Sequence, residues 1–207
     1  MDKNEKIKKR YNRVSKIYDL MEKPMENMSM GEWREKLMER IEGKNVLEVG
    51  VGTGKNLMYY PDTLEITGID FSPNMLKKAR NKIKDKKNIK LIEMDAQNME
   101  FADNTFDTVV TSCVFCSVPD PIKGLKEIRR VCKNDGKVIM LEHMRSENKV
   151  VGKFMDIINF IPLNIWGANI NRRTIENLKK AGFKKEDTHY QDIWSDIVKL
   201  IEIRNKK

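Results

Sequence analysis

Cysteine and histidine are scarce in this chain, which limits the metal and disulfide chemistry that it can carry. The 207 residues include three cysteines and two histidines. An odd number of cysteines without an apolar export signal predicts no disulfides. Cys113 and Cys116 have the spacing of a metal-binding pair. The remaining Cys132, His143 and His189 do not complete a regular four-ligand pattern, so we expect no metal site.

Long apolar runs are also missing. No stretch of eighteen or more apolar residues occurs, so we expect no membrane-spanning helix. The first residues, MDKNEKIKKRYNRVSK, are charged and contain no signal-peptide core, which predicts a cytoplasmic protein. The hydrophobic fraction of 40% and the charged fraction of 34% fit one globular domain over residues 1–207. Within it we expect residues 1–41 to form a helical N-terminal extension.

Charge is abundant and mostly positive. The formal net charge is +9, and much of the excess lies in residues 3–16 and 77–90. A basic balance permits an anionic partner, either a nucleic acid or an acidic membrane surface. We interpret the second cluster as the solvated face of a helix.

Short apolar segments alternate with helical patterns in the first two thirds of the chain. The predicted strands are Asn45–Val51, Leu64–Asp70, Ile89–Met94, Phe106–Val114 and Lys137–His143. One helix should begin at Ser72-Pro73, and another at Asp120-Pro121 with its end near Asn134–Gly136. Nearly continuous apolar strands separated by helices predict a parallel sheet covered on both faces.

The alternation pauses after His143. Residues 149–170 are rich in large apolar side chains and contain Pro162 and Gly167, which predicts a broken helix followed by a loop. Residues 171–181 should form a helix closed by Gly182, and residues 183–191 and 196–204 a terminal pair of strands.

A cluster of glycines closes the first predicted strand. The segment VLEVGVGTGKN, Val46–Asn56, places Gly50, Gly52 and Gly54 at alternate positions after an apolar run. Glycines at a strand-to-helix turn let the backbone approach a ligand because no Cβ is in the way. The next predicted strand ends in Asp70, whose carboxylate can accept hydrogen bonds from ribose hydroxyls. These features indicate a cofactor with an adenine-ribose unit.

The spacing of the glycines separates the candidate cofactors. The dinucleotide pattern is G-x-G-x-x-G, whereas this chain has G-x-G-x-G. The Walker pattern fails too, because Gly50 and Gly54 are too close and Asn56 replaces its serine or threonine. Glu48 would repel a pyrophosphate but suits a ligand that carries an ammonium and a sulfonium. A structural hydrogen bond from the loop amides to Glu48 is the alternative.

Four segments in order resemble motifs of the class I S-adenosylmethionine-dependent methyltransferases. They are VLEVGVGTG, GIDFSPNML, MDAQNMEFADNTFDTV and LKEIRRVCKNDGKVIMLEH. The resemblance implies a Rossmann-like α/β fold with a seven-stranded, mostly parallel sheet in the order 3-2-1-4-5-7-6. Its last strand would be antiparallel, helices would cover both faces, and the N-terminal extension would form a helical lid. The implied cofactor is S-adenosyl-L-methionine, with S-adenosyl-L-homocysteine as product.

The resemblance also implies cofactor-binding positions. The three glycines would pass under the methionine moiety, Asp70 would hold the ribose, and Phe71 would pack near the adenine. Glu48 would orient the loop or the cofactor's amino group. The complete set of expected cofactor-binding residues is Tyr11, Tyr18, Glu48, Gly50, Gly52, Gly54, Asn56, Asp70, Phe71, Met75, Asp95, Ala96, Ser112 and Cys113.

Methyl transfer from a sulfonium is an in-line displacement, so the enzyme must mainly align the reacting atoms and exclude water. A base is needed only where the acceptor starts protonated. The candidate catalytic residues are His143, which titrates near neutral pH, and Tyr18 on the lid-like segment RYNRVSKIYDLME. The candidate substrate contacts are His143, Arg145, Phe154 and Trp166. A structural histidine and simple helix packing are the alternatives.

The segments RYNRVSKIYD, VFCSVPDP and LEHMRS narrow the resemblance. They are similar to a group of bacterial phospholipid N-methyltransferases, quinone-biosynthesis C-methyltransferases and thiol methyltransferases. We expect an amphiphilic acceptor, first the amino head group of a phosphatidylethanolamine-like lipid, then a quinone or a small thiol. An apolar stripe beside lysines on the first helix fits peripheral contact with an anionic membrane, although helix packing gives the same pattern.

A protein of another class, binding RNA or acting as a non-catalytic partner, is the remaining alternative. Basic charge permits it, but the chain has no aromatic-rich RNA-binding motif. After the fourth predicted strand the chain reads Ser112–Phe115. This segment does not resemble the Asn/Asp-Pro-Pro-Tyr signature of enzymes that methylate base amino groups. We therefore do not expect a nucleic-acid partner, and no oligomeric state follows from the sequence.

Overall fold

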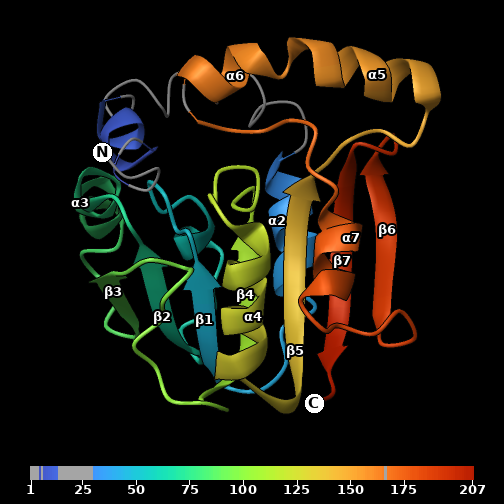
Figure 1. Ribbon diagram of the computed structural model, residues 1–207. Helices are drawn as coiled ribbons and strands as arrows, with labels where there is room; N and C mark the ends of the chain where they lie inside the picture. Colours follow the sequence, from blue (N-terminus) through green and yellow to red (C-terminus); the bar gives the residue numbers. More distant parts are fainter. Residues whose placement is uncertain (1–4, 6, 14–29, 166) are drawn as a thin grey trace.

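The computed structural model describes residues 5, 7–13, 30–165 and 167–207, which build one seven-stranded sheet (Figure 1). Its strand order is β3-β2-β1-β4-β5-β7-β6, and β7 runs antiparallel to both neighbours while the other pairs are parallel. The predicted order and the antiparallel last strand are confirmed. The strands are β1 (Asn45–Val49), β2 (Glu65–Asp70), β3 (Ile89–Glu93), β4 (Phe106–Ser112), β5 (Cys132–His143), β6 (Thr188–Trp194) and β7 (Val198–Asn205).

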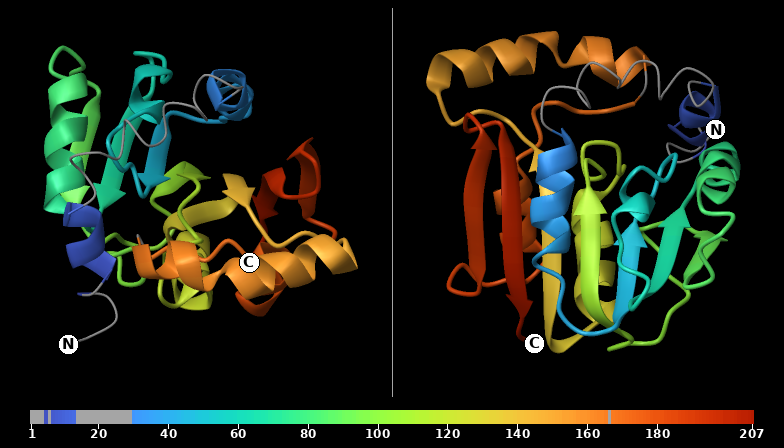
Figure 2. Two further views of the ribbon diagram at one scale, coloured as in Figure 1. Left: turned by 90° about the horizontal axis from the view of Figure 1, so that it is seen from above. Right: turned by 180° about the vertical axis from the view of Figure 1, so that it is seen from behind.

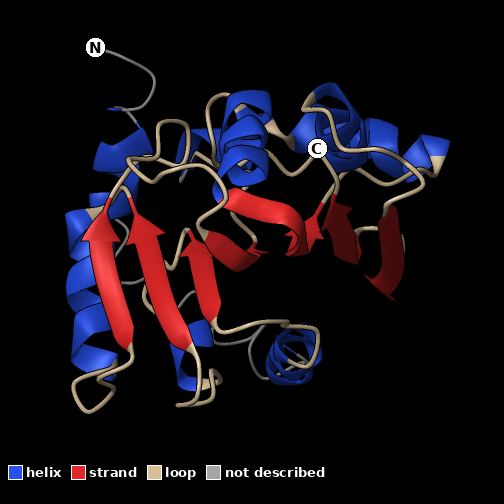
Figure 3. Ribbon diagram, turned by 90° about the horizontal axis from the view of Figure 1, so that it is seen from below, coloured by secondary structure: helices blue, strands red, loops and turns tan. Residues whose placement is uncertain are grey.

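Helices cover both faces of the sheet (Figures 2 and 3). On one face, α2 (Gly31–Met38) and α3 (Pro73–Lys82) contribute to one hydrophobic core. On the other face, α4 (Pro121–Val131) and α7 (Thr174–Lys180) contribute to a second. Successive residues of β1 enter opposite cores, because side chains alternate across a strand. Glu48 therefore belongs to the face covered by α2 and α3.

The predicted helix starts at Ser72 and Asp120 are confirmed. The Ser72 hydroxyl accepts a hydrogen bond from the Met75 amide at 3.3 Å, and the Asp120 carboxylate accepts one from the Lys123 amide at 3.0 Å. In both helices a proline follows the cap, where its missing N–H costs nothing. The end of α4 was predicted too late: it ends at Val131, and the Asn134–Gly136 turn lies inside the irregular start of β5.

The region after β5 forms a broken helix, as expected, with α5 (Lys149–Ile158) and α6 (Phe160–Ile165) separated at Asn159. Pro162 lies in the first turn of α6, where proline is tolerated, so the break precedes it. This pair lies beyond the carboxyl ends of the parallel strands (Figure 1). The helix predicted over residues 171–181 begins only at Thr174, because the Arg172 side chain donates to the Val118 carbonyl at 2.7 Å and Asn171 donates to Asp156 at 3.0 Å.

The N-terminal extension contributes two described pieces. Residues 7–13 are helical and lie near α6, where Arg10 Nη1 donates to the Leu163 carbonyl at 2.6 Å. The helix α2 packs on the face of the sheet, and η2 (Asn56–Met58), a single 3₁₀ turn, follows the glycine segment. Of the lid predicted over residues 1–41, residues 1–4, 6 and 14–29, which include Tyr18, fall outside the described residues.

Candidate active site

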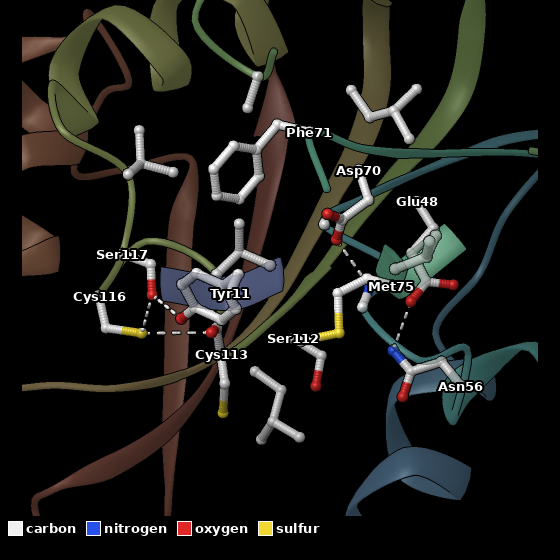
Figure 4. A pocket seen from close by; sticks show the side chains of 18 of the residues that line it. Tyr11, Glu48, Asn56, Asp70, Phe71, Met75, Ser112, Cys113, Cys116 and Ser117 are labelled. Atoms are coloured by element: carbon white, nitrogen blue, oxygen red, sulfur yellow. Dashed lines mark hydrogen bonds between the residues drawn. The ribbon is translucent and has the colours of Figure 1, made fainter. Parts of the chain in front are cut away.

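A cavity of about 350 Å³ lies at the carboxyl ends of the parallel strands (Figure 4). Its walls come from the segments that follow β1, β2, β3, β4 and β5, with further residues from the N-terminal extension. In an open parallel sheet this end is where ligands bind, because loops diverge there on either side of a topological switch point. The switch point of this sheet lies between β1 and β4, whose neighbours on the outer side are β2 and β5.

The glycine segment forms one wall of the cavity. Gly50 and Gly52 have φ angles of +73° and +54°, which side chains other than hydrogen rarely allow. A Cβ on Gly50 would lie 2.6 Å from Val114 Cγ2, whereas a Cβ on Gly52 would meet nothing within 4 Å. Gly54, expected at the cofactor, does not line the cavity: its Cβ position lies 2.9 Å from the Ala79 backbone, so this glycine lets α3 approach the loop.

Glu48 is buried at the base of the cavity and joined to a polar network. Its Oε1 accepts a hydrogen bond from Asn56 Nδ2 at 2.9 Å, and Asn56 Oδ1 in turn accepts one from Arg34 of α2. The Tyr60 hydroxyl lies near enough to Glu48 to lower the pKa of this acid, although the pair does not have the distance and angle of a full hydrogen bond. Burial raises the pKa of Glu48 to about 7, against the opposing effects of Tyr60, Asn56 and Arg34. The site therefore disfavours an uncompensated negative charge here.

Asp70 ends β2 and ties two turns together. Its Oδ2 accepts from the Gly52 amide at 2.9 Å and its Oδ1 from the Ser72 amide at 2.8 Å. Burial raises the pKa of this carboxyl to about 6, although both amide hydrogen bonds lower it. Each carboxylate oxygen can accept two hydrogen bonds, so Asp70 keeps acceptor capacity toward the cavity that it lines.

An aromatic pair and a polar turn form the side of the cavity next to Asp70. The rings of Tyr11 and Phe71 meet edge to face with centroids 5.8 Å apart. The Tyr11 hydroxyl shares a hydrogen bond with Ser117 Oγ, which connects the N-terminal helical residues to the loop after β4 (Figure 4). Asp95 and Ala96 line the cavity after β3, and the Gln97 side chain binds the Asp95 carboxylate at 3.0 Å.

The loop after β4 is held from below by a buried acid. Ser112 and Cys113 line the cavity, and Cys113 has a φ of +55°. Glu142 of β5 is fully buried, and its carboxylate accepts hydrogen bonds from Thr111 Oγ1 at 2.9 Å and from the Val114 amide at 3.1 Å. Burial raises the pKa of Glu142 to about 7. This acid fixes the turn that packs Val114 against Gly50.

His143, the last residue of β5, lies at the far end of the cavity. Burial lowers its pKa, so the neutral imidazole dominates near pH 7, and the ring makes no hydrogen bond to another described residue. The strands β2 and β5 are separated by β1 and β4, so three strand spacings, about 14 Å, lie between the strands of Asp70 and His143. The cavity therefore extends from the buried acid Asp70 to the neutral base His143.

Two expected substrate residues do not reach the cavity. Arg145 is ion-paired with Asp156 of α5 at 2.9 Å, and Phe154 points outward on α5 with 59% of its surface exposed. Trp166 and Tyr18 lie outside the described residues. Arg145 lies two residues beyond the end of β5, where the chain turns toward α5, and its guanidinium binds Asp156 and the Ser146 carbonyl there.

The remaining expected cofactor residues, Asn56 and Met75, line the cavity from η2 and the start of α3. Sequence reasoning missed several other lining residues: Met30, Trp33, Arg34, Gln97, Cys116, Ser117 and Ala168. A polar residue on an otherwise apolar helix face, as Arg34 is on α2, was the signal available for one of them. Burial raises the pKa of the Cys116 thiol to about 12, so it stays protonated.

Features of this cavity fit the methyl donor implied by the sequence. The Gly52 Cβ position is open, so the backbone can approach a ligand there. The buried Glu48 carboxyl lines the cavity, and a ligand with a positive charge would stabilise its ionised form. Asp70 retains acceptor capacity for hydroxyl donors. No cluster of three His, Cys, Asp or Glu side chains among the described residues could hold a metal.

Comparison with known proteins agrees with this geometry. The family described as "Methyltransferase domain" matches residues 47–140. A phosphatidylethanolamine N-methyltransferase of Cereibacter sphaeroides is 44% identical over 104 residues, 49% of this chain and 51% of that protein. A demethylmenaquinone methyltransferase of Geobacillus sp. (strain WCH70) is 36% identical over 149 residues, 68% of this chain and 64% of that protein. The chain thus spans between half and two thirds of these relatives.

Solved structures share the fold. A SAM-dependent methyltransferase from Thermotoga maritima superposes with a TM-score of 0.73 at 18% identity, over 95% of this chain and 99% of that one. A phosphoethanolamine N-methyltransferase of Haemonchus contortus, in complex with S-adenosyl-L-methionine, gives 0.63 at 22% identity, over 78% of this chain and 38% of that one. With the matched motifs, the sheet order and the glycine-lined cavity, the chain belongs to the class I S-adenosylmethionine-dependent methyltransferases.

Proposed function

We propose that this chain transfers a methyl group from S-adenosyl-L-methionine to the amino head group of a phosphatidylethanolamine-like lipid. The observation that carries the proposal is a single cavity with two buried acids beside an open glycine turn and a neutral histidine at its other end. When bound, the cofactor supplies a methyl group on a positively charged sulfur that leaves as a neutral thioether. The chain's own task is then to bind, align and exclude water.

Cofactor binding is assigned to the first two strand ends. Asp70 would accept hydrogen bonds from the ribose hydroxyls while its amide contacts keep the carboxylate in place. Glu48 would ionise beside the positive charge of the donor, because a nearby cation lowers the pKa of a buried acid. Tyr11 and Phe71 would pack near the adenine, with Asp95 and Ala96 at its edge.

Proton removal is assigned to His143. An alkylammonium has no lone pair for attack, so it must lose a proton before methyl transfer. The neutral ring of His143 can accept that proton at a free ring nitrogen, since it makes no hydrogen bond to another described residue. Histidine in this state suits an amine acceptor, which starts protonated at neutral pH.

The choice of a lipid amine over other acceptors rests on the relative with 44% identity, whose name states that substrate. A second candidate, methylation of a demethylmenaquinone-type quinone, is favoured by the longer match at 36% identity. A small thiol remains the third. A lipid or quinone acceptor would bring the protein to a membrane surface, and no helix among the described residues is long and apolar enough to span one.

The test is methyl transfer from labelled S-adenosyl-L-methionine to four acceptors in parallel: phosphatidylethanolamine vesicles, a demethylmenaquinone, a small thiol and RNA. We expect label in the lipid. The matched control is Asp70→Asn, which removes charge at the ribose position and should lower transfer to every acceptor. Label in the quinone or the thiol alone would replace the lipid assignment, and label in RNA alone, or in no acceptor, would refute the proposed activity.

A further inference from the structure

The outward face of the α5–α6 pair carries an apolar stripe. Val150, Phe154, Ile157, Ile161 and Ile165 follow the i, i+4, i+7, i+11, i+15 spacing of a single helix face, which continues across Asn159 because that residue has helical dihedral angles. Their exposed fractions are 79%, 59%, 61%, 47% and 45%. The 17 residues from Lys149 to Ile165 extend over about 25 Å at the helical rise per residue. Isolated exposed apolar residues are ordinary, but a continuous stripe of this length marks a contact surface.

The stripe is separate from the face by which the pair packs on the domain. Gly152, Met155 and Pro162 form the buried face. A Cβ on Gly152 would lie 2.4 Å from the Arg145 guanidinium, so α5 is seated closely on the domain. Asn159 adds a hydrogen bond from the Ile170 amide at 2.8 Å. Since these contacts fix the rotation of the pair, the stripe faces away from the cavity and has no partner in the described chain.

Positive charge borders the stripe. Lys149 and Lys153 are exposed beside it and make no ion pair with described residues. Of the acids near this end of α5, Asp156 is paired with Arg145, and Glu147 lies 3.7 Å from Lys199, which also pairs with Asp192. Exposed Arg13 belongs to the helical residues 7–13, which adjoin α6 at the same end of the molecule (Figure 2). Apolar side chains bordered by cations are complementary to an anionic lipid surface.

The position of the stripe relates it to the cavity. The pair lies beyond the carboxyl ends of the strands, the end at which the cavity lies, and the excursion that contains it leaves the sheet directly after His143 (Figure 1). A bilayer in contact with the stripe would therefore lie beside the cavity end of the molecule.

We propose that the outward stripe of α5–α6, with Lys149 and Lys153, is a docking surface for a bilayer that contains anionic lipid. The apolar side chains enter the boundary between head groups and acyl chains, and the lysine ammonium groups reach the lipid phosphates. The proposed partner is the lipid bilayer, and the residues of the stripe and the two lysines are its contacts. Docking does not depend on which acceptor is methylated.

The test is vesicle flotation of the full chain without methyl donor, using phosphatidylcholine vesicles with and without phosphatidylglycerol. We expect Phe154→Ser combined with Ile157→Ser to weaken binding to the mixed vesicles by about tenfold or more, because two inserted apolar side chains are lost. Lys149→Gln with Lys153→Gln should remove the preference for anionic vesicles. The matched control is Tyr190→Ser on β6, a side chain that is 50% exposed away from the stripe.

Equal flotation of the wild type and the Phe154/Ile157 double variant would overturn the proposal. It would also be overturned if sedimentation without lipid shows a wild-type dimer that the same double variant converts to a monomer, since a second copy would then cover the stripe. All of these substitutions replace exposed residues, and a thermal melt verifies that each variant is folded. Because no methyl donor is present, failure of methyl transfer leaves the binding result unaffected.

Discussion

Asp70 joins the turns that follow the first two strands by hydrogen bonds. Its carboxylate holds the Gly52 and Ser72 amides and faces the cavity. We predict that Asp70→Ala weakens binding of S-adenosyl-L-methionine by about 1–3 kcal/mol, the scale for unpairing a group that hydrogen-bonds a charged partner. Calorimetric titration measures this affinity. An unchanged affinity in a variant with a normal thermal melt would contradict the ribose role of Asp70.

His143 should control the pH dependence of the rate. Its pKa is lowered by burial, and only the neutral ring can accept a proton. The rate should therefore rise with pH around the lowered pKa of His143, which is below 6.5. Above that pKa, titration of His143 should change the rate no further. We predict that His143→Gln lowers the turnover number about 10²–10⁴-fold, removes this inflection and leaves cofactor affinity unchanged. A variant that retains both the rate and the inflection would show that His143 has a structural role.

Residues next to strand ends were predictable from sequence, whereas residues brought in by distant segments were not. Asp70 and Gly52 follow directly from the two first strands and the spacing of the glycines. Arg34 is absent from that logic, since its partner Asn56 lies 22 residues away on another element. Ser117 meets Tyr11 across 106 residues. Such contacts depend on how elements pack, which local patterns do not encode.

The turn after β1 contains two glycines, Gly50 and Gly52, that differ in the space around them. Both Gly50 and Gly52 have positive φ, so alanine at either position should cost about 1–2 kcal/mol of unfolding free energy for the backbone alone. Gly50→Ala should cost more, because its Cβ would lie 2.6 Å from Val114. Gly52→Ala should add no such clash but should lower cofactor affinity at least about tenfold, since its Cβ would occupy space at the cavity wall. Urea unfolding and calorimetry separate the two effects.

A second substitution tests the cause assigned to Gly50. Val114→Ala shortens the side chain that meets the added Cβ, so the Gly50→Ala/Val114→Ala double variant should recover the steric part of the loss but not the backbone part. Strictly additive losses in the two single variants would mean that the strain lies elsewhere in the turn.

Element boundaries show where sequence patterns are sufficient. The caps at Ser72 and Asp120 are local, and they were placed correctly because side chain, proline and turn occur within three residues. The helix predicted from residue 171 begins at Thr174, whereas the break between α5 and α6 was predicted without a position. Arg172 is held by Val118, 54 residues away, which keeps it out of the helix.

The stability of the whole molecule should depend on three buried acids. The pKa of Glu48 and Glu142 is raised to about 7 and that of Asp70 to about 6, each by burial. Their folded forms hold protons that the unfolded chain releases, so their stabilising contribution is present below the ordinary pKa and is lost as pH rises through the folded value. We predict that the thermal midpoint without cofactor falls between about pH 5 and about pH 7.5, by less than the three acids alone would give, because the lowered pKa of His143 adds stability as pH rises through 6.5.

Glu142→Gln tests how much Glu142 contributes to this loss of stability with rising pH. The amide keeps an acceptor for Thr111 but cannot ionise, so the variant should lose less stability than the wild type over the same pH interval. Acids whose pKa is lowered, such as Glu127 beside Arg130 and Glu42 beside Arg204, act in the opposite direction at lower pH and are the same in both proteins. Parallel melting curves across the interval would contradict the role given to Glu142.

The excursion between β5 and α7 begins and ends at one point. The Arg145 amide donates to the Arg172 carbonyl at 2.9 Å, so the two ends of the segment that carries α5 and α6 are joined at its base. Its length and composition can therefore change without displacing β5 or α7, because the closure cost of such a segment grows slowly with its length. A segment of another length in place of α5 and α6 would therefore change the outer surface at this end of the molecule, while β5 and α7 would keep their positions.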